Sequence, residues 1–207
     1  MKRLPIVSLF VALCLAATTH LAAAQESTPE IDLATPTVDE CTVEPRAADE
    51  IEALLGSAGE ATAEIDLATP NTDAATPTPF VAPEGTPVEE GEAASAIGEV
   101  VTQFYACQNA DDPLRMFALM TDPYVVRTLE EGNIDPAAFA NQGTPGAETV
   151  ASEQVTIAIN GIIEIQPEVY GVNVVGVRGA SGEEFTDYLI VVREDDGYRI
   201  DDLQNLG

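Results

Sequence analysis

The stretch AASAIGEVVTQFYACQNADDPLRMFALMTDPYVVRTLEEG, residues 93–132, decides the fold of this chain. Its first half repeats apolar side chains every three or four residues, which predicts one amphipathic helix. Its second half contains two Asp-Pro pairs, and a third pair follows at residues 135–136. Aspartate accepts hydrogen bonds from free backbone N–H groups and proline tolerates the first helical turn, so each pair predicts the start of a short helix. The apolar residues of the first helix are Ile97, Val100, Val101, Phe104 and Cys107.

Residues 155–166 alternate apolar and polar side chains, which is the pattern of a β-strand. We expect one long strand that bends at Gly161. A hairpin turn at Asn160-Gly161 is the alternative, because this dipeptide favours tight turns. Such a turn would mix apolar and polar residues on one face of the sheet, whereas a single strand keeps the apolar positions together.

Two further strands are predicted at residues 169–178 and 184–194. A three-residue turn at residues 195–197 then leads into a last strand. This turn length sets Val192 opposite Ile200, so the side of the 184–194 strand that carries Val192 is expected to face the helices. The other side of the same strand is expected to face outward.

The expected outward side of this strand carries Phe185, Leu189 and Val191 beside Asp187. This set is more apolar than the exposed side of a sheet in a lone soluble domain usually is. It predicts a homodimer that buries this face around a two-fold axis. The alternative is that an arm of the same chain covers the face.

The order of these elements resembles the nuclear transport factor 2-like superfamily, which includes ketosteroid isomerase and polyketide cyclase-like proteins. The resemblance covers residues 93–206 and rests on two phrases, FYACQNADD at 104–112 and EDDGYRID at 194–201. It implies an α+β fold in which N-terminal helices pack on a strongly bent antiparallel sheet, a cone-shaped barrel with an apolar cavity. The residues expected to line that cavity are Phe104, Tyr124, Tyr188, Ile190 and Val192.

Relatives of this fold differ in activity, so the resemblance predicts a cavity rather than a reaction. An isomerase of this type needs a carboxylate inside the cavity and a tyrosine or a protonated acid as hydrogen-bond donor. The acid in the middle of the strands is Asp187, which the expected register places outside. We therefore expect a non-catalytic binding or association module that takes a small apolar ligand. The alternatives are an isomerase or dehydratase acting on a small hydrophobic carbonyl compound, and a surface-display domain that carries a docking arm.

The N-terminus has the three parts of a secretory signal peptide. Basic residues at 2–3 precede an apolar run at 4–17 and a small-residue site at 22–24. We expect cleavage after residue 24 and a secreted or extracytoplasmic protein. The apolar run is shorter than the roughly 20 residues that a membrane-spanning helix needs, so no membrane anchor is expected after cleavage.

The chain is strongly acidic, with a formal net charge of -28. Such a charge repels nucleic acid phosphates and anionic lipids, so neither is expected as a partner. Without its signal peptide the chain contains no lysine, no histidine and two cysteines, which excludes metal sites built on histidine or on several cysteines. No glycine-rich phosphate loop is present, and no cofactor or metal is expected.

Residues 25–92 are rich in threonine, proline and acid, and we expect a linker that precedes the domain at residues 93–207. The phrase EIDLATP occurs twice in this linker, at residues 30–36 and again at 64–70. A duplicated linker explains the repeat most simply, and a pair of docking motifs is the alternative. An island at residues 41–56 has apolar residues at helical spacing, so we expect it to pack against the domain.

Two cysteines remain after removal of the signal peptide, and they are expected in an oxidising compartment. We predict a disulfide between Cys41 and Cys107, which would hold the island against the first helix. The loop that it closes corresponds to about 4 kcal/mol in the chain-entropy model. Two independent free thiols are the alternative.

Overall fold

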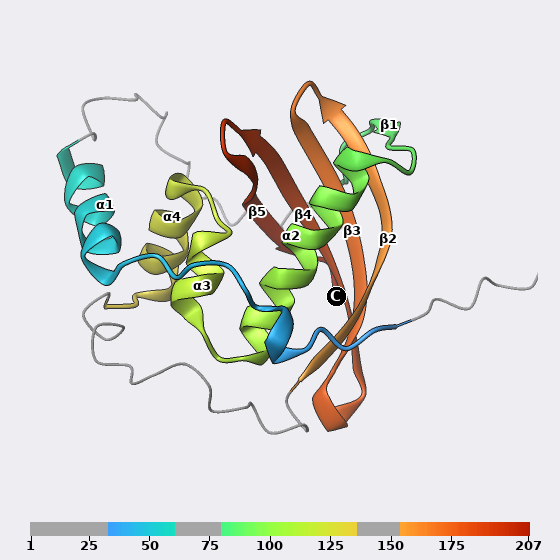
Figure 1. Cartoon of the computed structure of the whole chain (residues 1–207), viewed down its shortest axis with the longest axis horizontal. Helices are drawn as coiled ribbons and strands as arrows, with labels where there is room; N and C mark the ends of the chain where they lie inside the picture. Colours follow the sequence, from blue (N-terminus) through green and yellow to red (C-terminus); the bar gives the residue numbers. More distant parts are fainter. Residues whose placement is uncertain (1–32, 61–79, 136–153) are drawn as a thin grey trace, which may run out of the picture. The chain divides into compact units, whose positions relative to one another are not determined.

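The computed structural model describes residues 33–60, 80–135 and 154–207 (Figure 1). The expected signal peptide, the second EIDLATP copy and the helix expected after the third Asp-Pro pair lie outside these ranges. The described residues form an α+β fold, with helices followed by an antiparallel sheet. None of the helices in the described ranges is long and apolar enough to cross a membrane.

The three expected helices within residues 93–132 are present. They are α2 (Glu92–Asn109), α3 (Pro113–Ala118) and α4 (Asp122–Gly132). The Asp112 side chain accepts a hydrogen bond from the backbone N–H of Arg115 and so caps α3, as predicted. At α4 the cap is Thr121, and the Asp-Pro pair occupies the first helical turn.

The sheet comprises β1 (Thr86–Pro87), β2 (Val155–Gln166), β3 (Val169–Arg178), β4 (Glu183–Glu194) and β5 (Gly197–Asn205). These strands of the described residues lie in chain order, and neighbours pair antiparallel. The sheet is open, with β1 and β5 at its edges, and it is not strongly curled (Figure 1). The expected cone-shaped barrel is therefore corrected to an open sheet packed with helices.

Strand β2 is one continuous strand, as expected, and not a hairpin. Its pairing with β3 skips one residue, because Ile159 pairs with Val174 and Gly161 with Asn173. This β-bulge at Asn160 shifts the alternation, so the odd positions do not stay on one face. Ile159 and Ile162 both pack against the core, on either side of the bulge.

The expected orientation of β4 was wrong. The turn between β4 and β5 is one residue shorter than expected, so Glu194 pairs with Gly197, and Val191, not Val192, pairs with Ile200. A register change of one residue moves side chains to the other face of a sheet. The side that carries Val191 packs against the helices, and its residues there are all buried: Phe185, Asp187, Leu189 and Val191.

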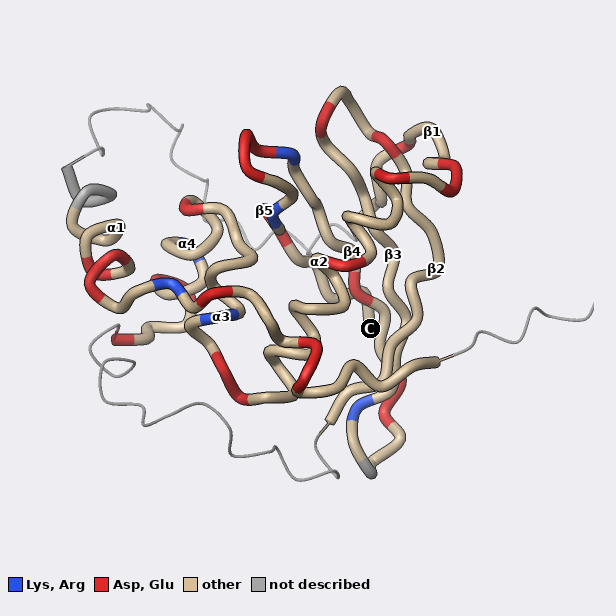
Figure 2. The backbone as a smooth tube through the Cα atoms, in the orientation of Figure 1, with Lys and Arg blue, Asp and Glu red and all other residues tan. Residues whose placement is uncertain are grey.

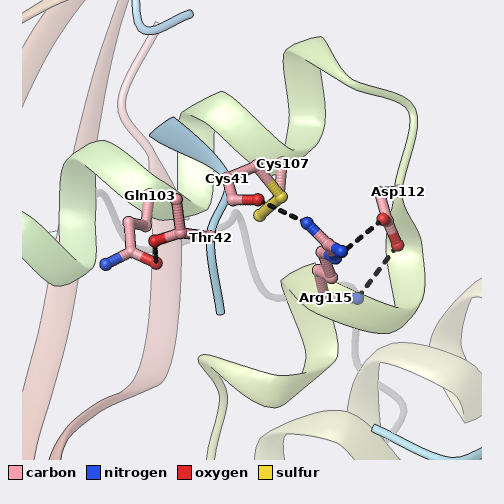
Figure 3. Close-up of a disulfide and its surroundings, with 6 residues drawn as sticks. All are labelled: Cys41, Thr42, Gln103, Cys107, Asp112 and Arg115. Carbon is pink, nitrogen blue, oxygen red and sulfur yellow. Dashed lines mark hydrogen bonds and ion pairs between the residues drawn. A yellow bond between two sulfur atoms is a disulfide. The ribbon is translucent and has the colours of Figure 1, made fainter. Parts of the chain in front are cut away.

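The arm before α2 packs against the domain over a longer stretch than the expected island. It contains a short 3-10 helix, η1 (Val38–Glu40), and the helix α1 (Ala48–Glu60), whose Ile51 is completely buried. The predicted disulfide between Cys41 and Cys107 is present and joins the arm to α2 (Figure 3). A disulfide of this kind indicates an oxidising compartment.

The guanidinium of Arg115 reinforces the disulfide connection. Its Nη1 donates to the carbonyl oxygen of Cys41 at 2.6 Å, and its Nε lies 3.4 Å from the carboxylate of Asp112. Figure 3 shows this side chain reaching from α3 to the arm beside the two sulfur atoms. The arm is thus linked to α2 by a covalent bond and to α3 by a charge-assisted hydrogen bond.

Candidate functional site

A buried hydrogen-bond network lies between α2 and the sheet. The hydroxyl of Tyr105 on α2 donates to Oδ2 of Asp187 on β4 at 2.7 Å, and Nδ2 of Asn205 on β5 donates to Oδ1 of the same carboxylate at 2.8 Å. Tyr105 is 2% exposed and Asp187 is 3% exposed. Both oxygens of the buried acid are therefore hydrogen-bonded, as a charge in an apolar core requires.

Burial, and secondly the negative charge of Asp187, raise the pKa of Tyr105 far above its usual value. The phenol is therefore held as a hydrogen-bond donor. Because neither Tyr105 nor Asp187 reaches solvent, the pair cannot meet a substrate without movement of the helix or of the strand. In this arrangement the network connects the helix layer to the sheet.

The five residues expected to line one cavity are divided between the two faces of the sheet. Phe104 is buried on the helix side, with its ring 5.3 Å from the ring of Tyr105 and nearly perpendicular to it. Tyr124 lies half-buried on α4, with the guanidinium of Arg127 5.0 Å from its ring centre. Burial, with a smaller effect from Asp202, raises the pKa of Tyr124 to about 12. The other three expected residues lie on the opposite side: Tyr188, Ile190 and Val192.

We call the side of the sheet away from α2 the outer face. It carries half-buried aliphatic residues on three neighbouring strands: Ile163, Val169, Val175, Val177, Ile190 and Val192. None of these residues belongs to the core beneath the helices. The residues assigned from sequence to a dimer contact are buried on the helix side, so that contact cannot form through them: Phe185, Leu189 and Val191.

Tyr188 lies flat on the outer face. Its ring centre is 5.4 Å from that of Phe80, and its hydroxyl lies above Gly171, where a Cβ atom would overlap it. The glycine is therefore needed for this close approach. Tyr188 is 4% exposed, and its hydroxyl has no hydrogen-bond partner among the residues that the structure describes. Burial raises the pKa of this phenol.

A groove of about 530 Å³ lies at one end of the outer face. Val175 and Val177 of β3 form its floor with Thr186 of β4, and Leu33 from the arm forms one wall. Glu184 contributes a carboxylate. The volume lies within the range of small-molecule sites, and the lining is mainly apolar, so the groove suits a small apolar ligand. The remaining lining residues are Gly176, Phe185 and Gly207.

Most acidic residues of the described ranges lie outside this groove, whose lining includes one of them, Glu184. Figure 2 shows the acidic residues mainly in turns, in helices and near the ends of strands. Strand β3, which forms the floor of the groove, contains no acidic residue. Within the described ranges, no group of histidine, cysteine, aspartate and glutamate residues is arranged to hold a metal ion.

Sequence reasoning missed the groove for two reasons. The face of β4 depended on a turn length that was one residue too long, and the wall at Leu33 depends on docking of the arm. The alternation of Val175 and Val177 was the signal that could have found the floor of the groove.

Comparison of the chain with protein-family models, with curated proteins and with solved structures finds no match.

Proposed function

We propose that this protein is an extracytoplasmic, non-catalytic binding module and that its ligand site is the groove on the outer face. The observation that carries the proposal is an apolar groove of about 530 Å³ whose floor, Val175 and Val177, lies on the side of the sheet outside the filled core. The disulfide between Cys41 and Cys107 supports the extracytoplasmic location. The fold then acts as a rigid support for the outer face.

The composition of the groove defines the class of ligand. Val175, Val177 and Leu33 offer apolar contact, and Glu184 offers one carboxylate. The net charge of -28 repels anions from the surface of the protein. We therefore expect a small, largely apolar molecule that is neutral or carries a positive charge.

The neutral fluorescent probe N-phenyl-1-naphthylamine tests this proposal. The substitution Val175→Asp places a charge on the floor of the groove, and we expect it to weaken probe binding at least about tenfold, because a buried charge without a partner is costly. Val192→Asp is the matched control, since it makes the same change on the same face but outside the groove lining. Equal affinities of the two variants for the probe would show that the groove is not the site.

One observation favours a second candidate, an isomerase or dehydratase acting on a small hydrophobic carbonyl compound. Asp187 and Tyr105 lie in contact on the helix side of the sheet, which is the pairing of acid and phenol that such chemistry uses. A β,γ-unsaturated ketone is a suitable probe, since its conversion to the conjugated ketone changes its ultraviolet absorbance. Turnover that Asp187→Asn lowers at least about a hundredfold would support catalysis. Turnover by the unaltered protein no faster than buffer would reject it.

A further inference from the structure

The first EIDLATP copy, residues 30–36, is seated against the edge of β2 in its described part, residues 33–36. Ala34 exchanges two backbone hydrogen bonds with Ile157, each 2.8 Å long. Pro36 is buried, and its carbonyl oxygen accepts a hydrogen bond of 2.9 Å from Nδ2 of Asn109. The segment therefore binds as a short additional strand whose end is held by a side chain.

The side chain of Asn109 connects the docked segment to β2. Asn109 is 1% exposed, its Oδ1 accepts from the backbone N–H of Val155 at 2.8 Å, and its Nδ2 donates to the Val155 carbonyl oxygen at 3.1 Å. One amide thus aligns the start of β2 and the end of the docked segment. A second groove, of about 430 Å³, runs beside the segment and is lined by Thr35, Pro36 and Ile157, among others.

The contacts of the docked segment require particular residue types at particular positions. Position 34 must supply a backbone N–H, which proline lacks, and position 36 supplies a buried ring. Side chains alternate along a strand, so Leu33 points to the other side from Ala34, where it forms the wall of the ligand groove. Positions 33, 34 and 36 of the segment therefore have distinct roles.

The second copy, residues 64–70, repeats all seven residues, so Leu67, Ala68 and Pro70 can make the contacts of Leu33, Ala34 and Pro36. Each molecule then carries two ligands for one site. We propose that the β2 edge is a receptor for EIDLATP and that, when residues 33–36 of its own chain leave it, it accepts residues 64–70 of a second molecule of this protein by strand addition. This self-association does not depend on the proposed ligand groove.

The disulfide favours the first EIDLATP copy over the second in their competition for the β2 edge. Pro36 is five residues from Cys41, which is bonded to Cys107 on α2. This short tether gives the first copy a high effective concentration at its own site. A second molecule therefore gains the β2 edge when residues 33–36 bind it less tightly or are removed. The segment of that second molecule that binds is residues 64–70.

A labelled peptide of residues 62–73 tests the receptor directly. Its target is the full mature chain with Ala34→Pro and Ala68→Pro, in which both internal ligands lack the required N–H. We expect this double variant to bind the peptide at least tenfold more tightly than the unaltered protein, whose own first copy competes. A peptide that itself carries Ala68→Pro is the matched control. Failure of the double variant to bind, or equal binding of both peptides, would overturn the proposal.

Light scattering then shows whether the bound residues 64–70 belong to the same molecule or to a second one. The single variant Ala34→Pro is expected to form dimers as its concentration rises, while the double variant stays monomeric. A single variant that stays monomeric at all concentrations overturns the assignment to a second molecule. Circular dichroism verifies folding, and a chain in which residues 30–36 are replaced by glycine and serine serves if Ala34→Pro does not fold.

Discussion

Tyr105 and Asp187 show how a polar pair is stabilised inside an apolar core. Two neutral donors, the Tyr105 phenol and the Asn205 amide, satisfy the carboxylate from two elements. Hydrogen bonds to charged groups are worth about 1.5–3 kcal/mol each, so the network contributes to the contact between the helices and the sheet. Sequence reasoning placed Asp187 on the wrong side of the sheet, since its face depended on the register of β4.

The raised pKa of Tyr105 predicts a weakening of the fold at alkaline pH. The unfolded chain releases this proton near pH 10, whereas the folded protein retains it, so the stabilisation is complete below pH 10 and is lost as the pH rises. One such tyrosine lowers the free energy of unfolding by about 1.4 kcal/mol per pH unit above its ordinary pKa.

Urea unfolding of the unaltered protein and of Tyr105→Phe at several values between pH 9 and 12 measures this effect. The free energy of unfolding of the variant should fall less steeply with pH. The difference in slope should be about 1.4 kcal/mol per pH unit, which corresponds to one proton. Parallel pH profiles for the two proteins would show that the Tyr105 proton is not linked to folding.

At the scale of elements, local chemistry made most of the fold predictable. Apolar spacing gave α2, a side-chain cap gave α3, and alternation gave the long strand β2. The face of β4 could not be read in the same way, because it depends on the length of one turn. The bulge at Asn160 had the same effect, since one extra residue reverses the alternation after it.

The candidate site was less predictable than the elements. Tyr188, Ile190 and Val192 were chosen as cavity residues from the expected register, and they lie on the opposite side of the sheet from Phe104. The groove also needs Leu33, which is far from β3 in sequence. Contacts of this kind depend on tertiary packing, which local spacing does not specify.

The disulfide predicts a large loss of stability when the arm is released from α2. Replacement of both cysteines, Cys41→Ser with Cys107→Ser, should lower the free energy of unfolding by about 4 kcal/mol, because the unfolded chain regains the entropy of a closed loop of 66 residues. Amide hydrogen exchange in α1 should increase as well, since Ile51 would lose its buried position.

Thermal unfolding and hydrogen exchange of the double variant measure both effects. A variant with unchanged stability would show that the docked arm is held by noncovalent contacts alone. The ion pair of Arg46 with Asp122 and the backbone hydrogen bonds of Ala34 are the contacts that would then carry it.

At the scale of the whole molecule, the sheet separates two roles. Its helix side is a filled core in which Val172 and Val174 are completely buried. Its outer face carries half-buried aliphatic residues and a groove whose floor includes Val175 and Val177. Under the proposed function, binding belongs to the outer face and stability to the helix side. Substitutions of Val175 or Val177, which are not core residues, should therefore leave the core intact.

Nuclear magnetic resonance of methyl-labelled valine tests this assignment most directly, because β3 presents both sides in alternation. With N-phenyl-1-naphthylamine added to saturation, binding in the groove should change the chemical shifts of the methyl groups of Val175 and Val177 and leave those of Val172 and Val174 nearly unchanged. Changes confined to Val172 and Val174 would place the ligand between the helices and the sheet, and the outer face would then not be the binding side.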